Sequence, residues 1–504
     1  MHHCLEIPEL VEHIALQFDS SESLGSLAAF ARTTRSFQGP ALDVLWRTQN
    51  TLKNLLKTMP SDLFKEEIIT GKRILASSAY LVSDWEPTRP YANRVKHFES
   101  IYSQDDISYS SLFPILALSL PSDCIFPNLT HIHWIRLNDD FPHIRLLLGP
   151  QVVAIRTQCA SATSLSLLSL LPRKCPLLTH VAISLPNINP GSELTAATTR
   201  SLSEFIRELH SIEHWDIHIP DMAALQHIAQ LPSLHSLDVH SLPPALSASR
   251  LDGDALFPSL RHLHITEESS ISSTIHFVEM CADATLETCI VEIQFYTPPA
   301  FVERILGTLA ASHRTSLIGL RIVMMVRSMM EEVDEDHHMF TIDNLLPALD
   351  LHNLRQIDLK SKLGFDFDDM AVSKMARAWP KLRSLDITEV DHAPGGVRTT
   401  FESLLHFARH CPELASLGMA FSTTNIPPLD QTPLPHRHLR YLDVKHSSFI
   451  SASAEVGEIA NFLSTVFPNL REVVTAEDSV RDEDGLERRR KSSKWEEVRA
   501  LLRA

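Results

Sequence analysis

One short phrase recurs along most of this 504-residue chain. It consists of an apolar residue, two variable residues, a second apolar residue, one variable residue and a third apolar residue, which can be written LxxLxL. Fourteen copies lie between residues 95 and 475, with a mean spacing of about 29 residues. The clear copies are FPNLTHIHW (126–134), CPLLTHVAI (175–183), LPSLHSLDV (231–239), FPSLRHLHI (257–265), LHNLRQIDL (351–359), WPKLRSLDI (379–387), CPELASLGM (411–419) and HRHLRYLDV (436–444). Weaker copies begin at Ile212, Leu286, Leu317 and Leu470, and the least regular at Val95 and Val152.

The phrase predicts a short β-strand. Its last two apolar residues are two positions apart, so they face one side of the strand while the variable residues face the other. Between the copies lie runs whose apolar residues recur every three or four positions, which is typical of a helix with one buried stripe. These runs include 201–210, 221–231, 301–313, 401–410 and 456–467. Neither element can bury its apolar face alone, so the sequence predicts an α/β repeat fold in which strand–helix units stack into a solenoid.

This organisation resembles the leucine-rich repeat, in particular the helix-backed kind that carries Cys-Pro, here Cys175-Pro176 and Cys411-Pro412. The resemblance covers residues 93–476 and implies a right-handed, horseshoe-shaped solenoid. Two departures, the irregular spacing and the absence of an Asn ladder after the strand, leave the curvature open. An unrelated α/β fold with leucine-rich strands is the alternative.

The N-terminal region has a different pattern. Residues 5–46 contain no LxxLxL copy and indicate an entry segment followed by helices. Pro8 stands near a helix start, where its missing N–H does no harm. The Gly39-Pro40 pair predicts a break between the second and third helices.

This region resembles an F-box. The family's opening Ile-Pro-acid pattern corresponds to Ile7-Pro8-Glu9, its Leu-rich helix ending in Arg and Phe to residues 24–37, and its closing Leu-Trp to Leu45-Trp46. A Thr33-Thr34 pair stands where the family more often has Cys. The resemblance implies that these helices dock on the Skp-family adaptor of a cullin–RING (SCF-type) E3 ubiquitin ligase, while the repeats recruit a protein client. The implied adaptor-binding residues are Leu5, Ile7, Pro8, Leu10, Val11, Ile14, Leu24, Leu27 and Trp46. The alternative is that the same apolar residues only pack a helical cap onto a repeat scaffold that has no ligase role.

The sequence therefore divides into four parts: an F-box-like helical domain (1–60), a linker or first helix of the array (61–92), the repeats (93–476), and a charged linker with a capping helix (477–504). In the last part RRRK (488–491) is a candidate nuclear import signal or simply a solvated linker. An acidic insertion, MMVRSMMEEVDEDHHMF (324–340), indicates a solvated loop inside the array.

The variable strand residues form the predicted client-binding surface. An Asp stands between the last two apolar positions in five copies, which suggests an acidic stripe for a basic client, or simply a solvated face. Histidines gather beside this stripe and could join the client surface, bind a divalent ion or face water. We expect client binding, and no metal site, at His214, Asp216, His218, Asp238, His240, His264, Asp358, Asp386 and Asp443.

Composition narrows the function. Asp and Glu number 62 against 45 Lys and Arg, a formal charge of −17, which disfavours binding to nucleic acid or an anionic membrane. Only 14 glycines occur and no GxG, GxSxG, HExxH, CxxC or EF-hand motif is present, so we expect neither an enzyme nor a cofactor. Seven scattered cysteines, an acidic N-terminus and short apolar runs indicate a reduced protein of the cytoplasm or nucleus.

Overall fold

The computed structural model describes residues 7–18, 23–60, 63–69, 72–77, 82–100, 107–109, 112–120, 123–135, 141–159, 162–185, 196–240, 242–243, 245–246, 251, 253, 255–267, 271–294, 297–324, 339–362, 364–389, 397–423, 426–428, 435–445, 447, 455–475 and 494–503. The chain divides into two compact units, Met1–Leu234 and His235–Ala504. The sequence predicts one array over 93–476, whereas this division falls inside that range. A stacked array can divide at any interface because each repeat contacts only its neighbours.

The first unit begins with three packed helices, α1 (Pro8–Leu16), α2 (Leu24–Ala31) and α3 (Arg35–Arg47). They share a small apolar core, made of Ala15, Leu27, Ala31, Ala41 and Val44. Phe30 extends this core by stacking on Phe18 and Phe37, with ring centroids 6.0 and 4.6 Å apart. The helical spacing seen in the sequence therefore corresponds to a real packed face.

The predicted break at Gly39-Pro40 is wrong, because α3 runs through both residues. The chain turns earlier, where Thr34 adopts an extended conformation (φ −149°, ψ 158°) just before α3. Pro40 removes one helical hydrogen bond. Ala41 and Val44, which follow it, are buried in the core, and that packing keeps the helix continuous.

Helix α3 leads directly into the repeats. Its C-terminal end continues into β1 (Thr48–Gln49), which pairs in parallel with β4 (His97–Ser100). Trp46 packs on Tyr91 with ring centroids 4.9 Å apart, and Arg94 forms an ion pair with Asp43. The helical domain is thus attached to the first repeat along α3.

Residues 61–92, assigned from the sequence to a linker or a first helix, contain an antiparallel hairpin instead. Its strands are β2 (Phe64–Ile69) and β3 (Lys72–Ser77), and β3 also pairs in parallel with β5 (Ile107–Ser108). A 3-10 turn (Val82–Trp85) and the short helix α5 (Arg89–Ala92) follow the hairpin. The sequence signal was available, because β-branched residues flank a two-residue Thr70-Gly71 connection.

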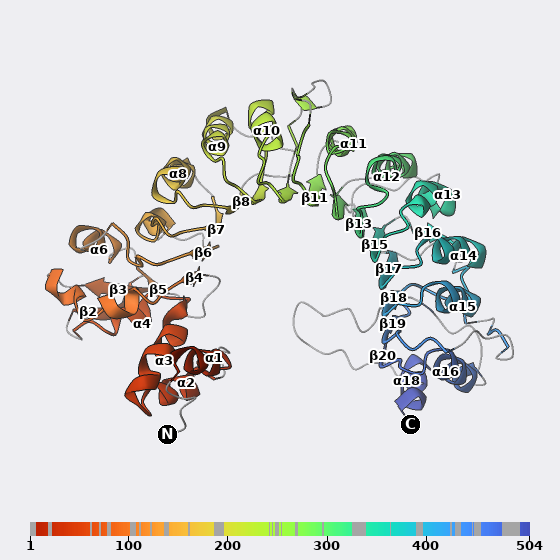
Figure 1. The fold of residues 1–504 in the computed structure, drawn as a ribbon, viewed down its shortest axis with the longest axis horizontal. Coiled ribbons are helices and arrows are strands. Elements are labelled where there is room, and N and C mark those ends of the chain that lie inside the picture. The colour runs from red at the N-terminus through yellow and green to blue at the C-terminus, as the bar shows by residue number, and fades with distance from the viewer. Residues whose placement is uncertain are drawn as a thin grey trace. The chain divides into compact units, whose positions relative to one another are not determined.

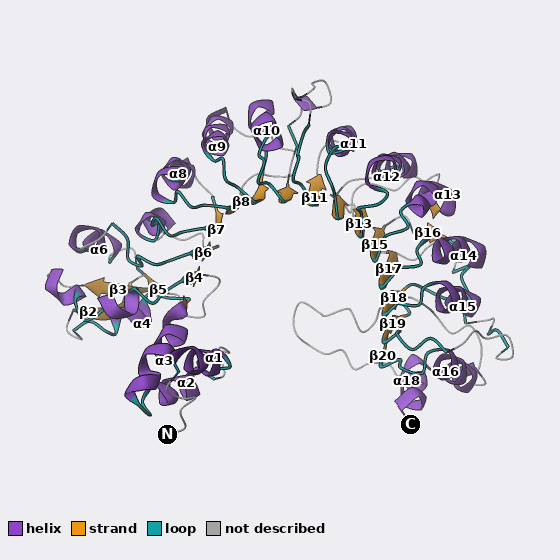
Figure 2. Cartoon of the chain, viewed as in Figure 1, coloured by secondary structure: helices purple, strands orange, loops and turns teal. Residues whose placement is uncertain are grey.

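The repeats of the first unit form a parallel ladder. From β4 it continues through β6 (His131–Trp134), β7 (Ala154–Gln158), β8 (His180–Ser184) and β9 (His214–Ile217). Helices α6 (Phe113–Ser119), α8 (Leu171–Lys174), α9 (Ala196–Glu208) and α10 (Met222–Ala229) cover one side of it (Figure 1). The other side carries the variable strand residues, and none of the described helices lies over it (Figure 2). We call this side of each ladder the open face.

The second unit repeats the arrangement with nine parallel strands. They are β10 (Ser236–Val239), β11 (His262–Glu267), β12 (Thr288–Ile293), β13 (Gly319–Met324), β15 (Gln356–Ser361), β17 (Ser384–Glu389), β18 (Ser416–Gly418), β19 (Tyr441–Asp443) and β20 (Glu472–Val474). The covering helices include α11 (Ile271–Met280), α12 (Pro299–His313), α14 (Asp369–Ala378), α15 (Phe401–His410) and α16 (Glu455–Val466) (Figure 1). Two short strands, β14 (Phe340–Thr341) and β16 (Phe365–Asp366), form a separate parallel pair. Each of the fourteen LxxLxL copies forms a strand of one of the two ladders.

A shared carbonyl group sets the register between repeats. The carbonyl oxygen of the first variable residue accepts N–H groups from both of the first two variable residues of the next repeat. Arg383 O, for example, accepts from Ala415 and Ser416 at 2.8 and 3.1 Å. The acceptors are Lys96, Thr130, Val153 and Thr179 in the first unit and His235, Arg261, Glu287, Ile318, Arg355, Arg383, Ala415 and Arg440 in the second. The carbonyl is thus a shared acceptor at the start of each strand, after which the strands pair one residue to one.

Side-chain amides tie neighbouring turns together just before the strand. Asn128, Asn353 and Asn469 each donate from Nδ2 to a backbone carbonyl of the preceding repeat, at 2.8 Å in all three cases. The sequence analysis looked for an Asn ladder after the strand and did not identify these residues. They satisfy carbonyl groups that the turn would otherwise leave without a partner.

The C-terminal helix α18 (Lys494–Arg503) packs against α16 in the second unit. Trp495 and Val498 are buried, and Trp495 Nε1 donates to Ser447 O at 2.9 Å. Leu501, placed on the same apolar stripe from the sequence, is exposed. The predicted nuclear import signal (488–491) and the acidic loop (331–338) lie outside the described residues.

Leu27 and Leu10 provide a matched test of the helical core. Leu27→Ala should lower the stability of α1–α3 by about 2–5 kcal/mol, because Leu27 is fully buried. Leu10→Ala should cost less than about 0.5 kcal/mol, because Leu10 is 44% exposed. Hydrogen exchange of the α1–α3 amides in the full chain measures both. Equal loss of protection in the two variants would contradict this assignment of core and surface.

Candidate functional site

The open face of the second unit carries charged residues in strict register. The residues between the last two apolar positions of each repeat lie side by side on adjacent strands, in the order Asp238, His264, Ile290, Arg321, Asp358, Asp386, Gly418 and Asp443. Four aspartates thus share this row with His264 and Arg321, and two of them, Asp358 and Asp386, are direct neighbours. The sequence alone placed the aspartates on one face, and the structure adds what stands between them.

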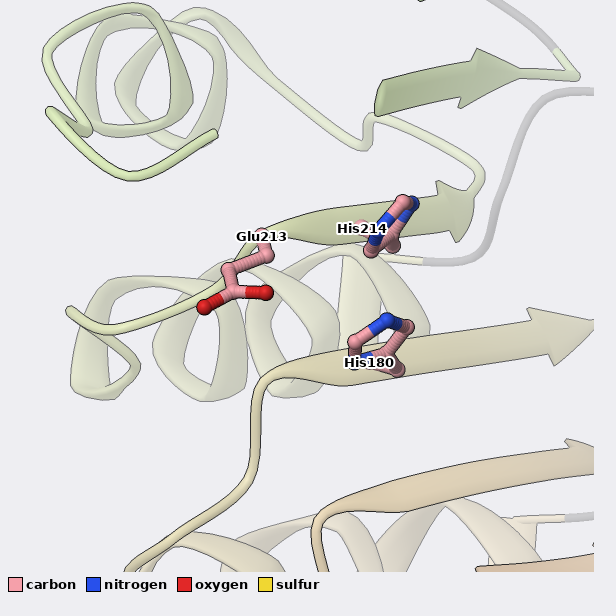
Figure 3. A group of neighbouring side chains, drawn as sticks. All are labelled: His180, Glu213 and His214. Atoms are coloured by element: carbon pink, nitrogen blue, oxygen red, sulfur yellow. The ribbon is translucent and has the colours of Figure 1, made fainter. Parts of the chain in front are cut away.

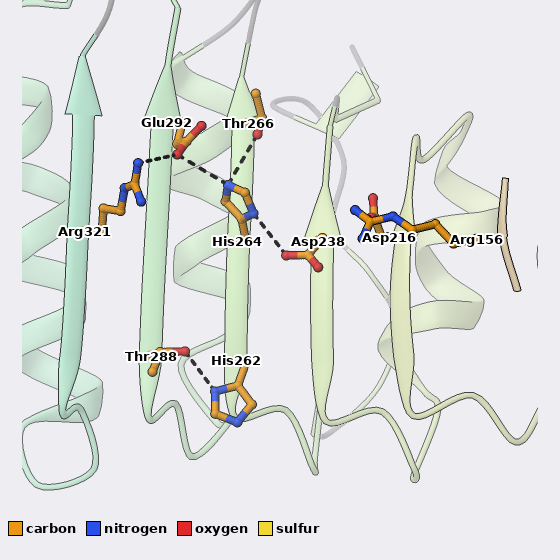
Figure 4. A network of polar contacts seen from close by, with 9 residues as sticks. All are labelled: Arg156, Asp216, Asp238, His262, His264, Thr266, Thr288, Glu292 and Arg321. Atoms are coloured by element: carbon orange, nitrogen blue, oxygen red, sulfur yellow. Dashed lines mark hydrogen bonds and ion pairs between the residues drawn. The ribbon is translucent and has the colours of Figure 1, made fainter. Parts of the chain in front are cut away.

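An alternating chain of charges crosses strands β10 to β15. His264 lies 3.1 Å from Asp238 through Nδ1 and 3.9 Å from Glu292 through Nε2. Arg321 approaches Glu292 and Asp358, at 3.4 Å in each case, and Lys360 lies 3.6 Å from Asp358. Figure 4 shows Asp238, His264, Glu292 and Arg321 following one another across neighbouring strands. We call this set, Asp238 to Lys360, the charge ladder.

A second set of ion pairs lies on the strands that follow the charge ladder, β17 and β19. Lys445 Nζ lies 2.7 Å from Asp386 Oδ1 and 2.8 Å from Asp443 Oδ2. Burial lowers the pKa of Lys445, but its hydrogen bonds to Asp386 and Asp443 outweigh that effect and the net pKa is raised. Strand β18 lies between the two aspartates, and Gly418 is the residue in register with both. The lysine side chain can cross there because Gly418 has no Cβ.

The first unit neutralises its aspartate in the same way, though less closely. Asp216 lies 3.8 Å from Arg156, two strands away (Figure 4). In the second unit Asp358, Asp386 and Asp443 each have an Arg or Lys of this chain within 4.0 Å, and Asp238 has His264, which is charged only when protonated. The stripe is therefore largely neutralised from within, which removes the reason to expect a basic client on it. Arg156, His264 and Arg321 stand at the same repeat position as the aspartates, whereas Lys360 and Lys445 stand two residues further along. From the sequence, only the aspartates at that position were considered.

The predicted histidines are distributed over the two units. His214 and His218 belong to the first unit and are partly exposed, while His240 and His264 belong to the second. His262, beside His264, lies 2.9 Å from Thr288 through its Nδ1. His264 itself belongs to the charge ladder through its contacts with Asp238 and Glu292.

Histidine pairs line the open face of the first unit. His97 and His131 meet edge to face at 4.7 Å, and His180 and His214 stack at 4.1 Å. The pKa of His131 is lowered, first by burial and then by the neighbouring His97 and His180. A lowered pKa keeps the imidazole neutral at pH 7.

His180, Glu213 and His214 form the best candidate for a divalent ion in this unit. Their donor atoms all lie within 4.8 Å of one another, and Figure 3 shows Glu213 beside the two stacked rings. Thr179 Oγ1 lies 2.8 Å from Nδ1 of His180, so that ring would bind an ion through Nε2. Ligands of tetrahedral zinc lie about 3.4 Å apart, since each is about 2.1 Å from the ion. An ion would need these three donors, two imidazole nitrogens and a carboxylate oxygen, at about that spacing.

The residues implied for adaptor binding separate into two sets. Val11, Leu27 and Trp46 are buried, so they support the helices from within. Pro8 is exposed, as are four large apolar side chains, Ile7, Leu10, Ile14 and Leu24 (45%, 44%, 36% and 41% exposed). Leu5 lies outside the described residues. We call Ile7, Leu10, Ile14 and Leu24 the exposed apolar stripe.

Reactive groups and enclosed space are limited in the described part of the chain. Six cysteines are free and buried, and burial raises the pKa of Cys159, Cys175, Cys289 and Cys411 to about 12. Such thiols stay protonated and unreactive at pH 7.

A hollow beside Phe365, Arg398 and Lys445 offers about 30 Å³, space for roughly two water molecules. Among the described residues, no helix is both long enough and apolar enough to cross a bilayer.

No protein-family model and no curated protein matches this chain. Among solved structures, the crystal structure of the Rad7 and Elc1 complex in yeast matches over 93% of this chain and 96% of the other chain. The identity is 13% and the TM-score 0.35. A similarity at that level leaves the partners of this chain to be argued from its own residues.

Gly418 allows a direct test of the lysine bridge. A Cβ at this position would lie 2.7 Å from Asp386 Oδ1 and 3.0 Å from Lys445 Cε. Gly418→Ala should therefore displace Lys445 and lower stability by about 1–3 kcal/mol. Gly457→Ala is the matched control, because a Cβ there meets nothing within 4 Å, and it should stabilise α16 by up to about 1 kcal/mol. Urea denaturation followed by circular dichroism compares them, and equal midpoints would contradict the role of Gly418.

Proposed function

We propose that this protein is the substrate-recognition subunit of an SCF-type cullin–RING ubiquitin ligase. Its N-terminal helices would dock on a Skp-family adaptor, and its repeats would recruit a protein client. The observation that carries the proposal is the exposed apolar stripe, which lies within the part of the sequence that resembles an F-box. No chemistry of its own is required, since holding a client near the transferring enzyme accelerates transfer by proximity.

The stripe has the character of a protein-binding surface. Nine large apolar side chains are exposed among the described residues, and four of them lie between residues 7 and 24. Ile7, Leu10 and Ile14 recur at helical spacing along the start of α1, next to the buried Val11 and Ala15. The apolar arc of α1 is thus wider than the face that the domain core covers. Ile7, Leu10 and Ile14 thus form a group along one helix, and grouped exposed apolar residues mark interaction sites, whereas single ones are ordinary.

The stripe does not serve to cap the repeats. The helical domain is attached through α3, where Trp46 packs on Tyr91 and Arg94 pairs with Asp43. Its core is complete without Ile7, Leu10, Ile14 or Leu24. A helical cap would bury its apolar residues against the array, and these four remain exposed on the other helices.

The test is binding of the full chain to purified Skp-family adaptor, measured by titration. The wild-type chain should bind with a Kd below about 1 µM. Ile7→Asp/Leu10→Asp should weaken binding at least about thirtyfold, because charges would enter the centre of an apolar contact. Both side chains are exposed, so the helices should keep their hydrogen-exchange protection.

Leu118→Asp/Leu177→Asp is the matched control. It places the same charges at two other exposed leucines of the first unit, which are 89% and 50% exposed. Adaptor binding by this variant should equal that of the wild type. Failure of the wild-type chain to bind any Skp-family adaptor would overturn the proposal and leave a repeat scaffold with a helical domain.

A further inference from the structure

The edge of the second unit at which the strands begin carries a row of arginines. The shared carbonyls identify the first variable residue of each repeat, and these residues occupy equivalent places on adjacent strands. Over the last five repeats they are Arg355, Arg383, Ala415, Arg440 and Arg471. We call the four arginines the arginine row. They occur in a chain whose net charge is −17.

Side chains at this position point to the same edge and reach one another. The evidence comes from earlier repeats of the same unit, where Arg261 Nη1 donates to Glu287 Oε1 at 2.8 Å. Both residues hold the first variable position, on neighbouring repeats. The same geometry places the arginine row along one line, with strands about 4.8 Å apart.

Most of the row lacks an acidic partner. All four arginines are exposed. Arg383 pairs with Glu413 at 2.8 Å, whereas Arg355, Arg440 and Arg471 have no carboxylate within 4.0 Å in the described part of the chain. On the open face, by contrast, four of the five predicted aspartates have an Arg or Lys of this chain within 4.0 Å, and Asp238 has His264.

Neighbouring residues add to the positive charge. Lys381 and Arg437, in the turns before two of these strands, are exposed, and Lys381 donates to Asn353 at 2.6 Å. Counting the row with these two gives six cations, against the two acids Glu413 and Glu472, a local charge of +4. His410, nearby at the end of α15, has a lowered pKa because of burial and then Arg377 and Arg409.

The row fits an extended acidic peptide. From Arg355 to Arg471 there are four strand spacings, or about 19 Å, the length of about six residues of extended chain. A guanidinium group binds a carboxylate through two parallel N–H bonds, and an unpaired one has both available. A nucleic acid is a poorer fit. Its line of phosphates continues beyond the row and would meet the rest of a chain whose net charge is −17, whereas a six-residue segment meets only the row.

We propose that the arginine row binds an extended Asp/Glu-rich segment of a protein client. That the bound protein is a client rests on the proposed function. An acidic client segment takes the place of the basic client expected from the aspartate stripe. Its physical basis, unpaired arginines in register on one edge, is independent of the adaptor-binding helices.

The test uses the full-length chain and a fluorescein-labelled peptide with six consecutive Glu residues between Gly-Ser flanks. Fluorescence anisotropy at low salt should show saturable binding by the wild type. The same peptide with six Gln should bind at least tenfold more weakly. Raising the salt from 50 to 300 mM should weaken binding of the Glu peptide several-fold, since exposed ion pairs are screened.

Two double variants of equal net charge separate the row from general electrostatics. Arg440→Glu/Arg471→Glu should lose at least tenfold in affinity. Arg200→Glu/Arg207→Glu, at exposed positions on α9 of the first unit, changes the net charge equally and should lose less than twofold. Arg440→Lys/Arg471→Lys should retain part of the affinity, because it keeps the charge but not the bidentate geometry.

Three outcomes would overturn the inference. They are no binding of the Glu peptide by the wild type, equal losses in the two Arg→Glu variants, or tighter binding of a short oligothymidylate than of the peptide. Adaptor titration of Arg440→Glu/Arg471→Glu should match the wild type. Failure of the peptide with intact adaptor binding would reject this inference alone, while failure of adaptor binding would reject the proposed function alone.

Discussion

A single backbone interaction organises the repeats of both units: the carbonyl of one first variable residue accepts two N–H groups from the next repeat. It fixes register, so residues at the same place in the repeat become neighbours on adjacent strands. It lies just before the strand, so the first variable residues, which include the arginine row, stand at the edge where the strands begin. Two surfaces of different charge balance therefore arise from positions only three residues apart in the repeat. One neutralises its own charges, and the other leaves arginines unpaired.

Pairing within the open face explains why composition misleads here. A formal charge of −17 and five aspartates at one repeat position suggest an acidic binding stripe. Lys445 alone engages two of those aspartates, and it can do so only because Gly418 stands between them. The binding potential of a repeat surface thus depends on the charges left over after pairing, which no single repeat reveals.

Much of the fold could be predicted from the sequence. The LxxLxL phrase located all fourteen repeat strands, because three buried apolar residues at fixed spacing have few other solutions. The hairpin at 64–77 and the continuity of α3 through Pro40 were missed, since both depend on packing outside the repeat. The site was less predictable. The resemblance to an F-box pointed to Ile7, Leu10 and Ile14, but it could not tell them from the buried Val11. The ion pairs across strands required the register.

The central claim is that the exposed apolar stripe on α1 and α2 is a docking surface while the repeats stay free for a client. Hydrogen–deuterium exchange of the full chain, with and without saturating Skp-family adaptor, tests it most directly. The account predicts increased protection at residues 7–31 and unchanged exchange across the strands of both units. Protection confined to the repeats, or no change anywhere in the chain, would contradict it.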